Sequence, residues 1–182
     1  MRVCVYCASS DEADPYFREE ARSLGAALAS AGHDLVYGGG GRGSMGALAD
    51  GALEVGGHVT GVIPTFMIER EWAHRGLTDL QEVEDMRTRK HRMLTHSDGV
   101  VALPGGCGTF EELFEAMTLK RLGLFHGQIV IVNSRRYYDD LVRFLERSVE
   151  ERFMTAEHLG LWRVVGGADE VLDALAVGDG DA

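Results

Sequence analysis

Short apolar runs alternate with longer amphipathic segments along the whole chain. Runs such as RVCVYC and QIVIV contain almost no charged residue, which is typical of strands buried on both faces of a parallel sheet. The runs predict strands at residues 2–7, 34–37, 58–63, 80–83, 99–103, 128–132 and 162–165. The amphipathic segments predict helices at residues 15–31, 44–55, 86–96, 109–122, 137–151 and 168–176.

This alternation predicts a doubly wound, Rossmann-like α/β fold: a mostly parallel sheet of about six to seven strands, with helices on both faces. The length of 182 residues agrees with one domain. We expect residues 1–177 to form a single nucleotide-binding domain and residues 178–182 to form a loose C-terminal tail. A ligand of such a fold binds at the carboxyl ends of the strands, where helix N-termini converge.

The net charge of −11 narrows the classes of partner. An acidic chain is a poor non-specific binder of nucleic acid or of anionic membranes, because both present negative charge. No apolar run approaches the length that spans a bilayer, and the first residues show no signal-peptide pattern. We therefore expect no nucleic-acid partner, no membrane partner and a cytoplasmic location.

The chain has three cysteines, which argues against a disulfide framework. Cys4 and Cys7 form a C-x-x-C pair inside a predicted strand, where a redox or zinc site is not expected. They are interpreted as buried thiols. The histidines show no metal-ligand spacing, so the sequence predicts neither a metal site nor a cofactor.

Two predicted strand ends carry residues suited to ligand binding. Residues 8–11 (ASSD) follow the first strand, and their serines, Ser9 in particular, either donate to an anion or cap the next helix. Residues 38–46 (GGGGRGSMG) follow the second strand, and Gly40 lies in their four-glycine run. These glycines either bring backbone close to a ligand or allow tight turns and close helix packing. The G-x-G-x-x-G match inside the run is weak evidence for a dinucleotide, because it does not follow the first strand.

A third strand end carries the most specific motif, PGGCGTFEE at residues 104–112. Its glycines let backbone N–H groups point into one concave site at the start of a helix, where the helix dipole favours an anion. The predicted phosphate-binding residues of this loop are Gly105, Gly106, Cys107, Gly108 and Thr109. Thr109 and Glu112 also have the spacing of a capping box, so Glu112 is either a capping residue or a catalytic residue.

Four cations, Arg87, Arg89, Lys90 and Arg92, lie close together near the start of a predicted helix. Cations at a helix N-terminus are electrostatically unfavourable. The cluster therefore indicates an anionic ligand, a group of glutamate partners, or a solvated face. At least one of the four is expected to point outward.

Together, P-G-G-x-G-T-x-x-E at 104–112 and the Arg89–Lys90 pair resemble the LONELY GUY (LOG) family of cytokinin riboside 5′-monophosphate phosphoribohydrolases. The resemblance extends from VYCASS through the glycine turn to YYDDL. It implies an N-glycosidase that cleaves a nucleoside 5′-monophosphate, a cytokinin riboside 5′-monophosphate or AMP, to a free base and ribose 5-phosphate. It also implies that Arg89 and Glu112 are catalytic and that Glu71, Lys90 and Thr118 join the loop in binding substrate.

The implied chemistry is physically reasonable. Glycosidic cleavage passes through an oxocarbenium-like transition state, which a carboxylate stabilises while it orients or deprotonates the attacking water. The older name of this family, lysine decarboxylase, fits poorly, because pyridoxal phosphate chemistry needs a Schiff-base lysine. The chain has only Lys90, inside the motif, and Lys120, late in a helix.

Two further expectations concern assembly and an alternative function. Thr118 lies nine residues after Thr109 and so points about 180° away from it on a helix. If both bind substrate, Thr118 serves the site of a neighbouring subunit, which predicts a homodimer. The alternative function is a non-catalytic nucleotide or molybdenum-cofactor carrier on the same scaffold, which would not need the couple of Arg89 and Glu112.

Overall fold

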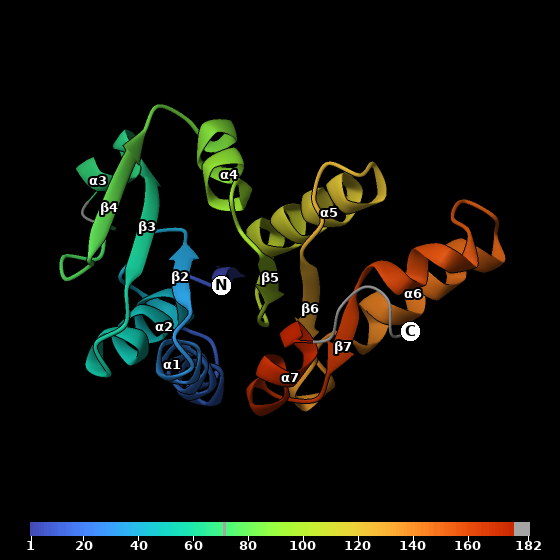
Figure 1. Cartoon of the computed structure of the whole chain (residues 1–182), viewed down its shortest axis with the longest axis horizontal. Coiled ribbons are helices and arrows are strands. Elements are labelled where there is room, and N and C mark those ends of the chain that lie inside the picture. Colours follow the sequence, from blue (N-terminus) through green and yellow to red (C-terminus); the bar gives the residue numbers. More distant parts are fainter. Residues whose placement is uncertain (71, 177–182) are drawn as a thin grey trace.

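The computed structural model describes residues 1–70 and 72–176, and these form a seven-stranded sheet (Figure 1). The strand order is β4-β3-β2-β1-β5-β6-β7, and every neighbouring pair is parallel. The strands are β1 (Arg2–Tyr6), β2 (Asp34–Tyr37), β3 (Val59–Pro64), β4 (Asp79–Val83), β5 (Gly99–Ala102), β6 (Gln128–Val132) and β7 (Arg163–Val165). The predicted doubly wound fold is confirmed. Glu71 and the predicted tail at 178–182 lie outside the described residues.

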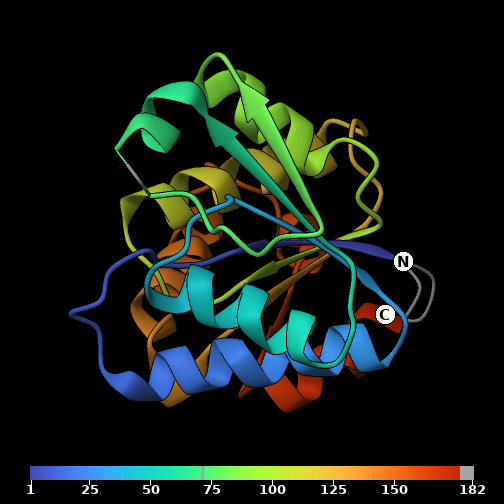
Figure 2. The ribbon, with the colours of Figure 1, turned by 90° about the vertical axis from the view of Figure 1, so that its left-hand side faces the viewer.

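Helices cover both faces of the sheet, as Figure 2 shows. One face is covered by α1 (Pro15–Ser30), α2 (Gly43–Glu54) and α7 (Val171–Ala176). The other is covered by α4 (Met86–Leu94), α5 (Cys107–Arg121) and α6 (Asp139–Glu150). The short helix α3 (Thr65–Glu69) and the 3₁₀ turns η1 (Ser134–Arg136), η2 (Ala156–Leu161) and η3 (Ala168–Glu170) complete the set. Among the described helices, none is long and apolar enough to cross a membrane.

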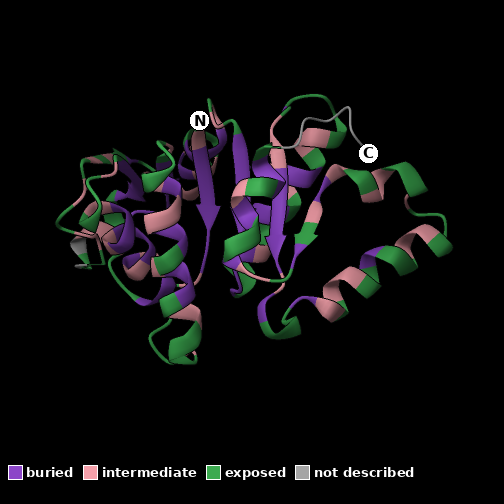
Figure 3. Ribbon diagram, turned by 60° about the horizontal axis from the view of Figure 1, so that its bottom comes forward, coloured by how far each residue is buried: buried purple, intermediate pink, exposed green. Residues whose placement is uncertain are grey.

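The central strands are buried on both sides (Figure 3). Side chains of one strand alternate between the two core layers: Val3 and Val5 pack towards α1 and α2, while Cys4 and Tyr6 pack towards α4 and α5. Cys4 and Cys7 are free and buried, as predicted, and burial raises the pKa of both thiols well above its usual range.

Some helix boundaries differ from the prediction. Helix α5 starts at Cys107, two residues earlier than expected, because Gly106 rather than a side chain provides its N-cap position. Helix α6 starts at Asp139 rather than residue 137, because Arg135 and Arg136 have positive φ angles of 50° and 63°. Helix α3 and the turn η2 were not predicted.

The strand order fixes where a ligand can bind. From β1 the chain adds β2, β3 and β4 on one side, and then returns to add β5, β6 and β7 on the other. The reversal lies between β1 and β5, and the loops that follow these two strands separate there to leave a crevice.

Candidate active site

A cavity of about 490 Å³ lies at this crevice. The loops after β1, β2 and β5 contribute to its wall, together with residues of α2, α3, α4 and α5. The lining residues are Cys7, Ala8, Ser9, Ser10, Gly38, Gly40, Arg42, Met45, Ile63, Met67, Trp72, Met86, Arg89, Gly106, Gly108, Thr109, Glu111 and Glu112. The cavity therefore lies at the carboxyl ends of the strands, as predicted.

Arg89 from α4 and Glu112 from α5 meet inside this cavity. Arg89 Nη1 donates a hydrogen bond to Glu112 Oε1 over 3.3 Å. The two side chains are only 6% and 5% exposed, so this is a buried ion pair. Two stretches of chain that are 23 residues apart in sequence therefore meet at this site.

Backbone carbonyls at the ends of two strands hold the Arg89 guanidinium in place. Arg89 Nε donates to Val62 O, and Nη2 donates to Gly38 O, both over 3.1 Å. A Cβ atom at residue 38 would lie 1.8 Å from Nη2, so only glycine leaves room for the guanidinium. The sheet thus fixes Arg89, and Arg89 in turn fixes the carboxylate of Glu112.

Burial of Glu112 raises the pKa of its carboxyl group to about 7. The positive charge of Arg89 opposes this shift, while the neighbouring carboxylate of Glu111 adds to it. A carboxyl group with a pKa near neutrality exchanges a proton readily at physiological pH, which suits a general base or acid.

The capping-box interpretation of Glu112 is wrong. With Gly106 as the N-cap residue, Glu112 is the sixth residue of α5, and its side chain pairs with Arg89. The serines after β1 do not cap α1 either, because the N-cap of α1 is Asp14, whose carboxylate accepts from Tyr16 N–H at 2.9 Å.

The loop before α5 has the features of an anion site. The first intrahelical bond runs from Phe110 N–H to Gly106 O, so the three preceding N–H groups, at residues 107–109, have no partner within the helix. A Cβ at Gly106 or Gly108 would meet no atom within 4 Å, which leaves that side of the loop open. At Gly105 a Cβ would lie 2.2 Å from Thr109 Oγ1, so this glycine is required by close packing.

The structure separates the other predicted site residues into two groups. Ser9 and Gly40 line the cavity with Gly106, Gly108 and Thr109. Four predicted binding residues do not line it: Lys90, Gly105, Cys107 and Thr118. Glu71 lies outside the described residues.

Lys90 and Thr118 have partners elsewhere. Lys90 Nζ pairs with Glu111 at 2.6 Å and with Glu115 at 3.1 Å. Thr118 is exposed, and its hydroxyl donates to Phe114 O over 2.8 Å. Neither residue lines the cavity of its own chain.

The cation cluster divides similarly. Arg89 is buried in the cavity, Lys90 has its glutamate partners, and Arg87 and Arg92 are exposed. The expectation that at least one of the four points outward is confirmed.

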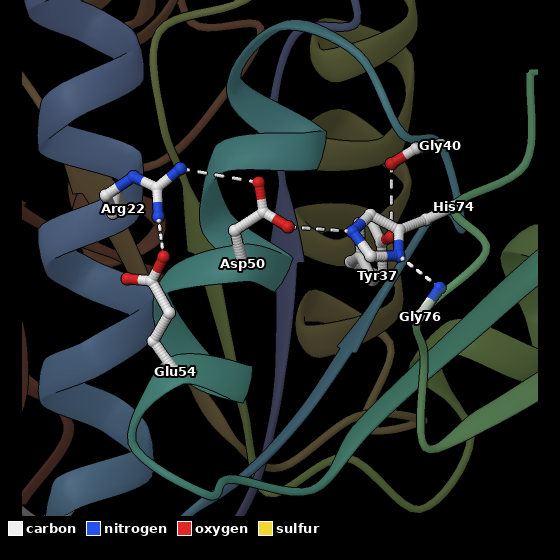
Figure 4. Close-up of polar contacts among 7 residues, drawn as sticks. All are labelled: Arg22, Tyr37, Gly40, Asp50, Glu54, His74 and Gly76. Carbon is white, nitrogen blue, oxygen red and sulfur yellow. Dashed lines mark hydrogen bonds and ion pairs between the residues drawn. The ribbon is translucent and has the colours of Figure 1, made fainter.

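The glycine run after β2 combines the two roles that the sequence left open. Gly38 and Gly40 line the cavity, and Tyr37 Oη donates to Gly40 O over 3.0 Å (Figure 4). Gly43 and Gly46 instead allow close packing of the backbone. A Cβ at Gly43 would lie 2.6 Å from Ser10 O, and one at Gly46 would lie 2.5 Å from Gly41 O.

The apolar part of the cavity wall was missed by sequence reasoning. It consists of Met45, Ile63, Met67, Trp72 and Met86. No periodicity distinguishes these residues, since they come from three helices, one strand and a loop. The one available signal was an unusual tryptophan in a stretch without a regular pattern.

The fold and the cavity define a Rossmann-type α/β protein with its site at the topological switch point. A family model described as "Possible lysine decarboxylase" matches residues 45–175. LOG1 of Arabidopsis thaliana, a cytokinin riboside 5′-monophosphate phosphoribohydrolase, is 41% identical over 160 residues, 87% of this chain and 75% of LOG1. LOG3 of the same plant is also named a cytokinin riboside 5′-monophosphate phosphoribohydrolase. It is 40% identical over 154 residues, which are 85% of this chain and 72% of LOG3. The chain belongs to the LOG family, as the motif resemblance indicated.

Solved structures share the fold at lower identity. The molybdenum cofactor carrier protein of Chlamydomonas reinhardtii superposes with a TM-score of 0.74 at 20% identity, covering 95% of this chain and 94% of that one. The molybdenum cofactor binding protein of Rippkaea orientalis superposes with a TM-score of 0.72 at 18% identity, covering 94% and 93%. Likeness at this level of identity establishes the fold alone.

Proposed function

We propose that this protein is a phosphoribohydrolase that cleaves the N-glycosidic bond of a nucleoside 5′-monophosphate, giving a free base and ribose 5-phosphate. The observation that carries this proposal is the buried pair of Arg89 and Glu112, which faces a glycine-walled cavity. A carrier protein has no need of a buried carboxyl group with a pKa near 7. The names of the relatives LOG1 and LOG3 support the same activity.

The 5′-phosphate binds at the N-terminus of α5 in this proposal. The N–H groups of residues 107–109 and the dipole of the 15-residue helix favour an anion there. Ser9 and Ser10 also line the cavity. Phosphate binding away from the reacting bond then positions the ribose at Glu112.

Glu112, in its ionised form, stabilises the positive charge that develops on the ribose and deprotonates the attacking water. Arg89 holds the carboxylate towards the cavity by the 3.3 Å hydrogen bond. The water adds its oxygen to the anomeric carbon, and the bond from that carbon to the base nitrogen breaks. The proton that Glu112 took from the water then passes to the departing base, which restores the ionised carboxylate. The steps assigned to Glu112 and Arg89 need neither a metal ion nor a cofactor.

The base lies against the apolar wall in this proposal. Met67, Trp72 and Met86 offer polarisable and aromatic surface to a purine ring and to an aliphatic N⁶ substituent. The volume of about 490 Å³ falls within the range of small-molecule sites. We therefore favour an adenine-type base, with or without an isopentenyl group, over a smaller pyrimidine.

The chain further acts as a cytoplasmic homodimer, without a nucleic-acid or membrane partner, in this proposal. The net charge of −11 argues against polyanionic partners. Phe114 and Thr118 on α5 and Leu122, its C-cap residue, are exposed at intervals of four residues, so they lie on one side of the helix. A second subunit packed on this face would receive Thr118 near its own site.

The lysine decarboxylase description is not proposed as the activity. Lys90 pairs with two glutamates, and Lys120 Nζ donates to Gly127 O over 2.9 Å. Neither lysine lines the cavity.

A turnover screen tests the proposal. The purified protein is incubated with nucleoside monophosphates, with the matching nucleosides and triphosphates as controls, and the free base is quantified. We expect release from adenine-type monophosphates only. Glu112→Gln should abolish release, whereas the control Glu115→Gln, on the same helix but outside the cavity lining, should retain it. Tight nucleotide binding without turnover would instead favour the carrier function.

A further inference from the structure

Residues 72–76, here called the strap, carry Trp72 into the cavity wall. The strap runs beside the glycine run that follows β2. Gly41 N–H donates to Trp72 O and His74 N–H donates to Gly39 O, both over 2.9 Å. Gly40 and Ala73 form an isolated antiparallel bridge between the two segments. The strap is thus a short segment bridged to the glycine run of the cavity wall.

A histidine anchors the strap to the body of the protein. His74 Nε2 lies 2.9 Å from Asp50 Oδ1 on α2, and Gly76 N–H donates to His74 Nδ1 over 3.0 Å (Figure 4). Since Nδ1 accepts a hydrogen bond, the ring proton is on Nε2 and is donated to Asp50. The imidazole is 14% exposed, so it is the most protected member of this network. One side chain therefore ties both the middle and the end of the strap to α2.

Asp50 is itself held in position by a neighbouring helix. Arg22 from α1 approaches Asp50 Oδ2 at 3.3 Å and Glu54 Oε1 at 2.5 Å, as Figure 4 shows. These ion pairs are partly exposed and individually weak. Their contribution is geometric, because they fix the rotamer that presents Oδ1 of Asp50 to His74.

The strap is separable from the catalytic pair. Arg89 is fixed by Gly38 O and Val62 O, and Gly40 O has its own bond from Tyr37 Oη. None of these bonds involves His74. Loss of the His74 anchor should therefore loosen the wall that carries Trp72 and leave the Arg89–Glu112 pair in place.

We propose that His74, through Asp50, is a positioning residue that fixes Trp72 in the cavity wall and thereby sets selectivity for the base. This role rests on the proposed hydrolase activity, but the anchoring of Trp72 does not. His74 touches no reacting atom; it acts through the strap. It should govern how well an N⁶-substituted adenine is distinguished from adenine, and not the rate of bond cleavage.

Steady-state kinetics test the selectivity. AMP and N⁶-isopentenyladenosine 5′-monophosphate are compared on wild type, His74→Ala, Asp50→Ala and the double variant. We expect the KM ratio of the two substrates to change by about tenfold in each single variant, with kcat preserved within about twofold. The double variant should match the single ones, because the two residues act as one unit. His58→Ala, an exposed histidine before β3, is the control and should match wild type.

Two results would overturn the role of His74: an equal loss of kcat on both substrates, or additive effects of the two single variants. His74→Gln serves as the conservative variant, because its amide can still donate to Asp50. It should recover most of the wild-type KM ratio.

Trp72 fluorescence tests the anchor without any turnover. The chain has two tryptophans, Trp72 and the buried Trp162. In a Trp162→Phe background, His74→Ala should shift Trp72 emission to the red and increase its quenching by acrylamide. The same difference can be measured with Trp162 present by subtracting the signal of Trp72→Phe variants. An unchanged emission would refute the anchor, whereas a wild-type protein that hydrolyses neither nucleotide would refute the proposed function alone.

Discussion

Replacing Glu112 by Gln isolates the free-energy cost of keeping this carboxyl group buried. Burial raises its pKa from 4.5 to about 7. Between these two values the folded protein retains a proton that the unfolded chain releases. Glu112 therefore destabilises the fold progressively as the pH rises through this window, and the penalty is complete above the folded pKa. Gln has no such titration, so the difference in stability between the two proteins should depend on pH.

The magnitude follows from the two pKa values. Integrating the linkage relation from about pH 5 to about pH 8 gives a change of about 2–3 kcal/mol in favour of Glu112→Gln. For a chain of this size, that corresponds to a relative shift in Tm of about 5–10 °C. The attraction of Arg89 for the carboxylate is already contained in the folded pKa, because it acts only on the ionised form of Glu112. Differences in packing between Glu and Gln do not depend on pH, so they leave the slope unchanged.

Thermal unfolding of both proteins, followed by circular dichroism across this pH range, measures the slope. The same carboxyl group should control the pH profile of kcat/KM, with activity rising as the pH passes through about 7 and Glu112 becomes ionised. Glu115→Gln, at a half-buried glutamate of α5 that does not line the cavity, is the control and should show a smaller slope. Parallel melting curves for wild type and Glu112→Gln at every pH would refute the raised pKa and, with it, the proposed general base.

Three other substitutions have definite expected outcomes. Gly38→Ala should displace the Arg89 guanidinium, because the added Cβ would lie 1.8 Å from Nη2; turnover should fall at least about a hundredfold, measured as initial rate. Gly108→Ala should fold normally, because a Cβ there meets nothing within 4 Å, but should raise KM for monophosphates by about tenfold by crowding the phosphate. Thr118→Glu should convert the proposed dimer to monomers in sedimentation velocity; an unchanged sedimentation coefficient would place the interface elsewhere.

Local chemistry made the sheet and the glycine loop of the site predictable. Residues 129–132 (IVIV) and 99–102 (GVVA) carry no polar side chain, and only a strand covered on both faces accommodates such runs. The anion-binding role of the motif at 104–112 was predictable from its residue types. Glycines directly before a helix leave the backbone N–H groups uncovered, and such groups bind anions. Local chemistry did not indicate the pairing of Arg89 with Glu112, which lie 23 positions apart. Only the resemblance to the LOG family implied that the two residues act together.

Other features depended on contacts that no local pattern encodes. For the cation cluster the sequence left glutamate partners as one of three roles; that Lys90 pairs with Glu111 and Glu115 is determined only when α4 and α5 pack together. The start of α5 was misplaced because Thr109 has the side chain of a good N-cap, whereas the bend at Gly106 decides the boundary. Trp72 was missed because its place in the wall comes from pairing with the glycine run.

The reversal of strand order between β1 and β5 has a consequence for how activity arises during folding. Arg89 lies on α4, which follows β4 at the end of the half-sheet β1 to β4. Glu112 lies on α5, which follows β5, the first strand of the half-sheet β5 to β7. Arg89 and Glu112 can pair only when the two half-sheets have joined between β1 and β5. A nascent or cleaved chain that lacks either part leaves one charge without its partner, so competence to hydrolyse should appear in a single cooperative step with completion of the native sheet.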